Sequence, residues 1–516
     1  MLKRNTCLSR LLLGICLPLL LLALNTEVFA DVIEFKNGAT ITGTVTEQDN
    51  KTLSINVDGK IFTYSKSEIK NIEIEGKAIS PPSPLSVGGM EADPPVKDSI
   101  DNLNPLYGNL NPERAGFRVA NTKYGTMNIS VWAYVRYLNQ LNLDDYYTDG
   151  SGIEKSVHQR NDIQFSKTSI QFKGWIFDER LIYLAYVWAS PNVMGQATAF
   201  ALVGNIEYLI TDRLKIGGGI QGLPTSRAME LSHPRFNRVD TRSMSGEYFR
   251  GSYAAGIWLE GQPLDDLYFR TVLANSLSKL GVDAGQIDTK LATWSTGAWW
   301  LPKGAYATPG MIWNGGGYGD FENHQEAAFR LGAHYTTSIE NAESQPDVND
   351  PENSQIRVSD GRLIFKSPEV FNGGLLDELR YQMVAVDAGI KYKGFALEGE
   401  VYFRKLNDFK FLNDPGDFGF SYLNDTGFSI QPSYFILKQK LQAYLIGSKI
   451  WGDYGDPWDG VVGLNWYPLK SDKFQRQFRI NGDAQYTSQS PIGNLSLPYT
   501  VGGKGWTFSV IAEMFF

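Results

Sequence analysis

Residues 384–403 read VAVDAGIKYKGFALEGEVYF and contain two segments of alternating polarity on either side of a turn. The apolar face carries Val384, Val386, Ala388, Ile390 and Tyr392, and after the turn Leu397, Gly399, Val401 and Phe403. The opposite face carries Asp387, Lys391, Glu398 and Glu400. A period of two residues is typical of a β-strand with one apolar and one polar face. Lys393-Gly394 between the segments predicts a tight hairpin.

The same alternation recurs from about residue 126 to the C-terminus and predicts about sixteen strands, an even number. We expect them at 126–138, 162–177, 180–190, 197–210, 213–222, 246–261, 266–276, 291–301, 325–340, 380–393, 395–406, 425–437, 439–451, 458–468, 475–489 and 505–516.

Alternation alone would also fit a soluble sandwich, but the connections between the segments differ systematically in length. Short connections lie near 178–180, 211–213, 263–266, 393–394, 437–439 and 470–473. Long connections lie at 139–160, 223–245, 277–290, 341–379, 407–423 and 490–504. Short turns at one end and long loops at the other are typical of outer-membrane barrels. Two connections break the rule, because 191–196 is short where a long one is expected and 302–324 is long where a short one is expected.

Aromatic residues crowd the strand ends, as in the girdles that meet lipid headgroups. They are Trp188, Trp258, Trp299, Trp300, Trp451, Trp458 and Trp466. The aromatic fraction of 13% excludes a disordered chain, and a mean hydropathy of −0.25 excludes a bundle of membrane helices. We therefore predict an all-β fold, in which residues 126–516 form a transmembrane antiparallel β-barrel. It must close because unpaired backbone groups are costly in lipid.

The sequence before the barrel divides into three further segments, and each has its own predicted structure. Residues 1–30 contain basic residues, an apolar core and a small residue at Ala30, which indicates a signal peptide; a signal anchor is the alternative. Both cysteines lie within it, so the rest of the chain has no thiol. Residues 31–75 predict a small SH3-like or Sm-like β domain that binds or oligomerises, or serves only as a spacer. Residues 76–125 are rich in proline and glycine and predict a linker leading into the barrel.

Three stretches carry a resemblance to a known family. They are Ala512-Glu513-Met514-Phe515-Phe516, the run from Gly217 to Ser226, and Glu247-Tyr248-Phe249-Arg250 followed by Ala255-Gly256-Ile257. Over roughly 115–516 the chain resembles Gram-negative outer-membrane porins, and among them the phosphate-selective porin O and P family. The resemblance implies a homotrimer and a third loop that folds into the lumen. It also implies that Phe516 ends a signal for the barrel-assembly machinery. The domain at 31–75 departs from the usual layout of that family.

The connection 223–245 is rich in arginine and is the candidate for the narrowest part of the channel. It contains Arg227, Arg235, Arg238 and Arg242 against only Glu230 and Asp240, with His233 as a further charge at low pH. Guanidinium groups suit oxyanions because they donate forked hydrogen bonds. One interpretation is an anion-selecting constriction. The alternative is that these arginines bind carboxylates of the barrel wall and only hold the loop in place.

Alternation also predicts which charged side chains line the lumen. The basic ones are Arg136, Lys173, Lys215, Arg250, Arg270, Arg330, Lys391, Arg404 and Arg479. The acidic ones are Glu207, Asp387, Glu398, Glu400 and Asp483. Such a mixed lining would serve a general diffusion channel equally well. His334 is expected to face the lumen beside Arg330 as a solvated side chain.

We predict that the protein is a channel rather than an enzyme. The four histidines show no metal-ligand spacing, no catalytic constellation is evident, and we expect neither a cofactor nor a metal. A net charge of −8 does not suggest nucleic-acid binding. The predicted function is passive diffusion of small hydrophilic solutes, particularly anions such as phosphate, through the outer membrane of a Gram-negative bacterium. The alternative is a structural or binding barrel whose N-terminal domain, in the periplasm, tethers or recruits envelope partners.

Overall fold

The computed structural model describes residues 31–36, 39–48, 52–57, 60–74, 77–79, 117–190, 199–231, 235–277, 291–302, 306, 316–342, 356–469, 478–493 and 497–515. The predicted signal peptide, most of the predicted linker, His233 and Phe516 lie outside these residues. The chain divides into two compact units, Met1–Pro94 and Pro95–Phe516.

The first unit contains a six-stranded antiparallel sheet in the order β4-β3-β2-β1-β5-β6. Its strands are β1 (Asp31–Phe35), β2 (Thr40–Gln48), β3 (Thr52–Val57), β4 (Lys60–Ser65), β5 (Ile69–Ile74) and β6 (Lys77–Ile79). Alternate residues of these strands meet in a small apolar core of Ile33, Leu53, Ile55 and Ile69. The first unit thus contains a small β-sheet, and the sheet extends past the predicted boundary at residue 75, because β6 lies in the stretch predicted as linker.

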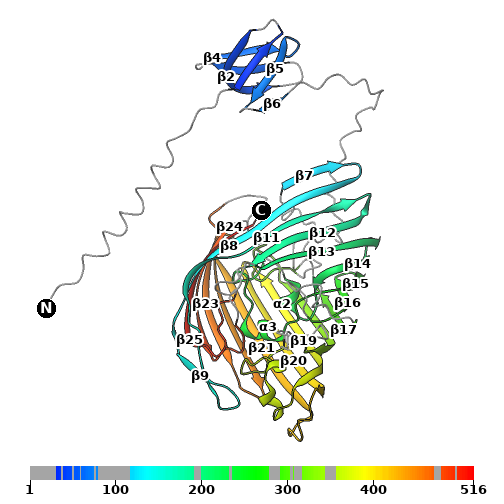
Figure 1. Cartoon of the computed structure of the whole chain (residues 1–516), viewed down its shortest axis with the longest axis vertical. Coiled ribbons are helices and arrows are strands. Elements are labelled where there is room, and N and C mark those ends of the chain that lie inside the picture. The colour runs from blue at the N-terminus through cyan, green and yellow to red at the C-terminus, as the bar shows by residue number, and fades with distance from the viewer. Residues whose placement is uncertain are drawn as a thin grey trace, which may run out of the picture. The chain divides into compact units, whose positions relative to one another are not determined.

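The second unit is a closed antiparallel barrel of sixteen strands, which confirms the predicted fold and strand number (Figure 1). The strands are β8 (Gly125–Leu143), β11 (Asn161–Ile176), β12 (Asp178–Ser190), β13 (Ala199–Thr211), β14 (Leu214–Gly222), β15 (Tyr253–Leu264), β16 (Leu267–Ala274), β17 (Thr293–Trp300), β18 (Ala328–Asn341), β19 (Leu376–Tyr392), β20 (Phe395–Phe411), β21 (Tyr422–Leu437), β22 (Leu441–Gly452), β23 (Trp458–Trp466), β24 (Phe478–Ser488) and β25 (Lys504–Phe515).

The barrel closes where β25 pairs with β8, from Gly505 opposite Leu143 to Phe515 opposite Trp132. The preceding strand β7 (Phe117–Thr122) pairs with the first residues of β8, where β25 does not reach. Both edges of the sheet are thereby joined, as a sheet surrounded by lipid requires. Within the described part of the chain, no helix is both long and apolar enough to cross a bilayer.

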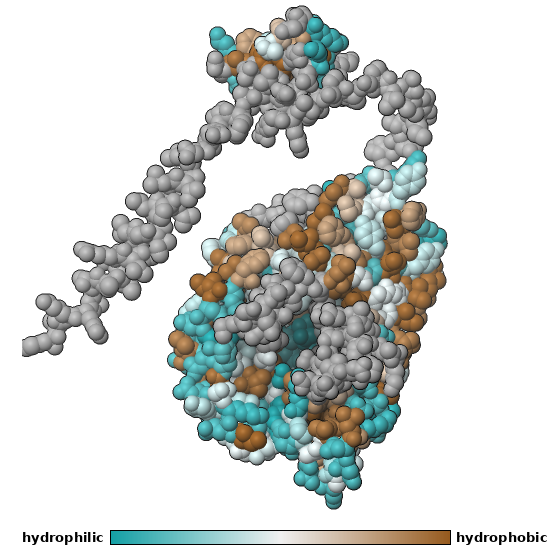
Figure 2. Space-filling view, viewed as in Figure 1, coloured by the Kyte–Doolittle hydropathy of each residue, from teal (hydrophilic) through white to brown (hydrophobic). Residues whose placement is uncertain are grey.

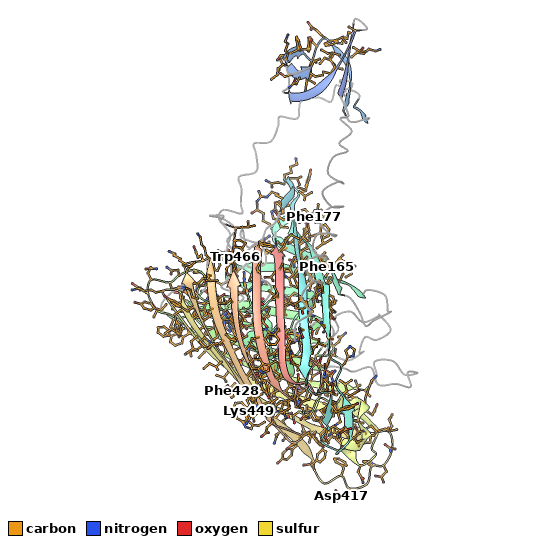
Figure 3. The ribbon with its side chains drawn as sticks, turned by 90° about the vertical axis from the view of Figure 1, so that its left-hand side faces the viewer. Phe165, Phe177, Asp417, Phe428, Lys449 and Trp466 are labelled. Atoms are coloured by element: carbon orange, nitrogen blue, oxygen red, sulfur yellow. The ribbon has the colours of Figure 1, made fainter. Side chains whose placement is uncertain are left out.

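The hairpin predicted at Lys393-Gly394 forms in the structure. Tyr392 pairs with Phe395, which leaves Lys393 and Gly394 as a two-residue turn. Both turn residues have positive φ, 47° and 85°, as expected of the turn type that matches the twist of an antiparallel pair. Figure 3 shows the two ends of the barrel: Phe177, in the turn between β11 and β12, lies at one end, and Asp417, in the loop between β20 and β21, lies at the other.

The outer surface of the barrel is apolar, and alternation assigned its residues correctly. In β25, Trp506, Phe508, Val510 and Met514 are exposed, whereas Thr507, Ser509 and Glu513 are buried. Exposed tryptophans lie near both ends of the strands: Trp300 and Trp466 at the end that carries the β15–β16 and β21–β22 turns, and Trp451 and Trp458 at the other end.

Two tryptophans expected in these girdles face the interior instead. Trp258 and Trp299 are buried, at 3% and 1% exposure. Trp258 donates its indole N–H to Glu207 at 3.0 Å, and Trp299 lies beneath the guanidinium of Arg330 at 5.5 Å. Trp299 and Trp300 are adjacent, so only one of them can face outward. A cluster of aromatic residues in the sequence therefore does not by itself assign a side chain to the lipid face.

One predicted strand is wrong at its start. Residues 246–250 were expected to begin a strand, but Met244–Phe249 form the short helix α3, and β15 begins at Tyr253. The hydroxyl of Ser243 accepts a hydrogen bond from the backbone N–H of Gly246 at 3.1 Å and so caps the first turn of the helix.

Candidate functional site

The candidate site is the lumen of the barrel, into which the connection between β14 and β15 folds. This connection contains α2 (Arg227–Glu230) and α3 (Figure 1), and its described residues from Leu223 to Phe249 are all buried. Some of its contacts lie on the far wall: Ser245 donates to the carbonyl oxygen of Phe428 at 2.9 Å, and Phe249 stacks on Tyr402 at 4.9 Å. We call residues 223–252 the constriction loop.

The lumen wall carries charged side chains that bind each other across neighbouring strands. Lys215 lies 3.0 Å from Glu207 and 3.5 Å from Glu260, and Glu260 also accepts from Arg270 at 2.7 Å. These four residues come from four consecutive strands, β13 to β16. Because opposed residues of an antiparallel pair share a face, the alternating pattern brings them together.

Other predicted lumen residues make similar pairs. Arg479 binds Glu513 at 2.6 Å, Arg404 binds Asp425 at 2.6 Å, and Lys391 lies 3.5 Å from Glu322. Arg136 donates to Gln164 at 3.1 Å, and Lys173 is buried on β11. Arg250 follows α3 rather than lying on a strand, and binds Glu247 at 2.6 Å. The lumen therefore holds acidic and basic groups in similar measure.

Two of the four predicted loop arginines, Arg227 and Arg238, bind acceptors outside the loop. The backbone N–H of Arg227 donates to Glu400 at 2.6 Å and its guanidinium donates to the carbonyl oxygen of Gly316 at 2.8 Å. Arg238 makes a forked pair with Asp483, at 2.8 and 3.2 Å. These contacts agree with the alternative in which arginines hold the loop against the wall.

The other two loop arginines, Arg235 and Arg242, contact the loop itself or the connection between β17 and β18. Arg242 donates to the carbonyl oxygen of Ala228 at 2.8 Å and lies 3.3 Å from Glu247. Burial opposes ionisation of Glu247, but the guanidiniums of Arg250 and Arg242 hold its pKa below the usual value. Arg235 is buried at 1% exposure, and its carbonyl oxygen accepts the backbone N–H of Tyr318 at 2.9 Å.

Tyr318 belongs to a second inward segment, the unusually long connection between β17 and β18. The ring of Tyr318 lies 5.2 Å from the guanidinium of Arg227 and 6.2 Å from the ring of Phe236, both in the constriction loop. Tyr306 of the same connection donates to Glu398 at 2.5 Å. The anomalous length of this connection thus has a structural consequence, because two segments that start at opposite ends of the barrel meet in the lumen.

The same connection contains a cluster of polar side chains that was not predicted from the sequence. Asp320, Glu322 and His324 place their ligand-type atoms within 4.8 Å of one another, a grouping visible in the sequence only as Asp-x-Glu-x-His. Asp320 accepts from the ring of His324 at 2.5 Å and from the backbone N–H of Gly394 at 2.7 Å. Burial opposes the charge, but these donors hold the pKa of Asp320 below its usual value. The carboxylate of Asp320 therefore holds the connection between β17 and β18 against the turn of the β19–β20 hairpin.

At the long-loop end, further connections pack on the constriction loop. Ile364 and Phe371, between β18 and β19, share an apolar cluster with Met244 and Phe249 of the loop and with Tyr499, between β24 and β25. Figure 2 shows that the face of the barrel toward the viewer is hollowed and that the residues visible inside the hollow are hydrophilic. The constriction loop is therefore held on several sides.

Comparison with known proteins identifies solved structures only. No family model matches the sequence, and no curated protein matches it. OmpT, an outer membrane protein of Vibrio cholerae, aligns with a TM-score of 0.45 and 8% identity over 77% of this chain and 99% of its own. The outer membrane channel DcaP of Acinetobacter baumannii aligns with a TM-score of 0.45 and 10% identity over 78% and 100%. An anion-selective porin from Comamonas acidovorans aligns with a TM-score of 0.44 and 10% identity over 76% and 99%.

Proposed function

We propose that this protein is an outer-membrane channel through which small hydrophilic solutes diffuse passively. The observation that carries the proposal is the division of the barrel into an apolar outer face and a charged lumen containing an inward-folded loop. A closed sixteen-stranded cylinder is wide enough to enclose water, and a loop folded inside it reduces the opening to the size of small solutes. Such an arrangement needs neither a cofactor nor a catalytic group.

We further propose weak selectivity for anions, with phosphate among the solutes that pass. The lumen arginines and lysines are the groups that an oxyanion would contact. Their carboxylate partners, such as Asp483 beside Arg238 and Glu260 beside Arg270, reduce the net field that a passing ion experiences. Membership of the phosphate-selective porin O and P family, assembly as a homotrimer, and recognition of Phe516 by the barrel-assembly machinery also remain proposals.

The proposed function is tested by recording single channels of the purified, refolded protein in planar bilayers. We expect stepwise currents and, in a gradient of potassium chloride, a reversal potential on the anion side. Arg235→Gln should shift this potential toward zero, because it removes a positive charge from the constriction loop. Arg213→Ala is the matched control, since Arg213 is 57% exposed in a short turn. An unchanged potential for Arg235→Gln would contradict the anion preference.

A second candidate function is a closed barrel that serves as a structural or binding element of the envelope. It is favoured by the contact between the two inward segments, where Arg227 and Arg235 meet Gly316 and Tyr318. In this case the N-terminal sheet, placed in the periplasm, would contact the partner. Purified protein that inserts into bilayers but passes no current would support this function and exclude the channel.

A further inference from the structure

His334 connects the wall of the barrel to the first residues of the constriction loop. It lies on β18, faces the lumen and is buried at 3% exposure, so the solvated side chain expected from the sequence is wrong. One ring nitrogen, Nδ1, lies 3.0 Å from the carbonyl oxygen of Pro224, where the loop leaves β14. The other, Nε2, lies 3.0 Å from Oδ2 of Asp387 on β19. The ring therefore bridges the loop and the wall.

Both ring nitrogens face acceptors, and this determines the protonation state that fits the site. A carbonyl oxygen only accepts hydrogen bonds, so Nδ1 must carry a proton to bind Pro224. Asp387 already accepts from Nε of Arg330 at 2.6 Å, as an ionised carboxylate does, so Nε2 must also carry a proton. A neutral imidazole has one proton and would leave one nitrogen lone pair directed at an oxygen. The geometry thus fits the imidazolium form.

The charges around the ring agree with this assignment. The groups that face it are Arg330 on β18, Asp387 on β19, Glu230 of α2, whose Oε1 is 3.9 Å from Nδ1, and Glu400 on β20. Arg330 binds Asp387 and also Glu230, the latter at 2.8 Å. An imidazolium and a guanidinium balance the two carboxylates that they contact. Loss of the ring proton would leave both carboxylates with one cation.

The neighbouring backbone is shaped to admit the ring. Gly297 on β17 is paired directly with His334, and a methyl group built on Gly297 would lie 2.6 Å from Nδ1. The same methyl group would lie 3.3 Å from the ring of Pro224. Gly332 in turn leaves room for the carboxylate of Asp387, since a methyl group there would overlap Oδ2. The side chains of this bridge therefore occupy space that glycines leave open.

We propose that His334 positions the start of the constriction loop and makes the channel sensitive to pH. In the protonated state it holds the start of the loop on the wall, and as the pH rises and the proton is lost the loop loosens. A hydrogen bond to a charged group contributes enough to change the opening equilibrium of the loop about tenfold or more. This inference deepens the proposed channel function and rests on it for its effect on current.

The test has one readout that depends on current and one that does not. Single-channel conductance of the full protein is compared at pH 5.5 and pH 8.5, together with hydrogen–deuterium exchange of residues 223–231, corrected for the intrinsic pH dependence of exchange. We expect lower conductance and about tenfold greater protection at pH 5.5. His334→Gln, neutral at both pH values, should abolish both differences, whereas His158→Gln, in an exposed loop, should leave them unchanged.

Gly297→Ala provides a second variant that keeps every ionisable group. It should displace the ring and reduce protection at pH 5.5 to the level of His334→Gln. If exchange and conductance keep their pH dependence in His334→Gln, the inference is overturned. Absence of current at both pH values would overturn the channel function, and exchange in the same samples would still decide whether His334 holds the loop.

Discussion

Val462→Arg should destabilise the folded barrel by about 2–4 kcal/mol, because it places a guanidinium in the hydrocarbon layer. Val462 is the central residue of β23, and its side chain is 53% exposed on the outer face. It lies between Leu445 of β22 and Ala484 of β24, also outward-facing positions. The long side chain would therefore have to reach past apolar neighbours toward a headgroup.

The measurement is the free energy of unfolding from lipid vesicles in denaturant, followed by tryptophan fluorescence. Leu412→Arg is the matched control, since Leu412 is 71% exposed in the loop that follows β20. An exposed loop position should change the free energy by no more than about 0.5 kcal/mol. Equal and small effects of both substitutions would mean that Val462 does not face lipid, and the assignment of the outer surface would have to be abandoned.

Much of this fold could be predicted from alternation because each strand of a membrane barrel must divide its side chains between lipid and lumen. The hairpin around Lys393 and Gly394 shows the principle at its simplest, since the pattern and the turn residues agree. Helix α3 shows where the principle stops. A six-residue helix buried on all sides does not divide its residues into an apolar and a solvated face, so its sequence gives no helical periodicity. Ser243 as an N-cap was the one local signal.

The pairing inside the lumen could not be predicted, because it joins residues far apart in the chain. Arg238 and Asp483 are separated by 245 residues, and nothing local to either indicates the other. His334 was placed correctly on the inner face and beside Arg330, but its burial depends on where the constriction loop lies. The two inward segments decide how much of the lining is accessible. Alternation reports only which side of the wall a residue is on.

Arg238→Ala should release the middle of the constriction loop from the wall while the barrel stays folded. The guanidinium binds Asp483 through two nitrogens and also donates to Gln485 at 3.3 Å. The adjoining loop backbone is held on the same wall, where Asn465 donates to the carbonyl oxygen of Asn237 at 2.8 Å. Removing one partner of a buried ion pair costs about 3–5 kcal/mol, because the other charge stays buried without compensation.

This loss of free energy destabilises the packed position of the loop and not the barrel, because the wall strands keep their backbone pairing with both neighbours. We therefore expect greater single-channel conductance, larger current fluctuations and faster hydrogen exchange in residues 235–242, with little change in the unfolding of the barrel. Arg213→Ala is again the control, since its pair with Asp265 is exposed and contributes at most about 1 kcal/mol.

A second substitution separates charge from packing. Arg238→Ala combined with Asp483→Ala removes both members of the pair, so no buried charge is left without a partner. If the buried carboxylate drives the release, the double variant should recover part of the exchange protection that Arg238→Ala loses, and its conductance should fall back toward that of the unaltered protein. A single variant with unchanged conductance and exchange would show that the remaining contacts of Asn237 and its neighbours hold the loop without the ion pair, and that Arg238 does not position it.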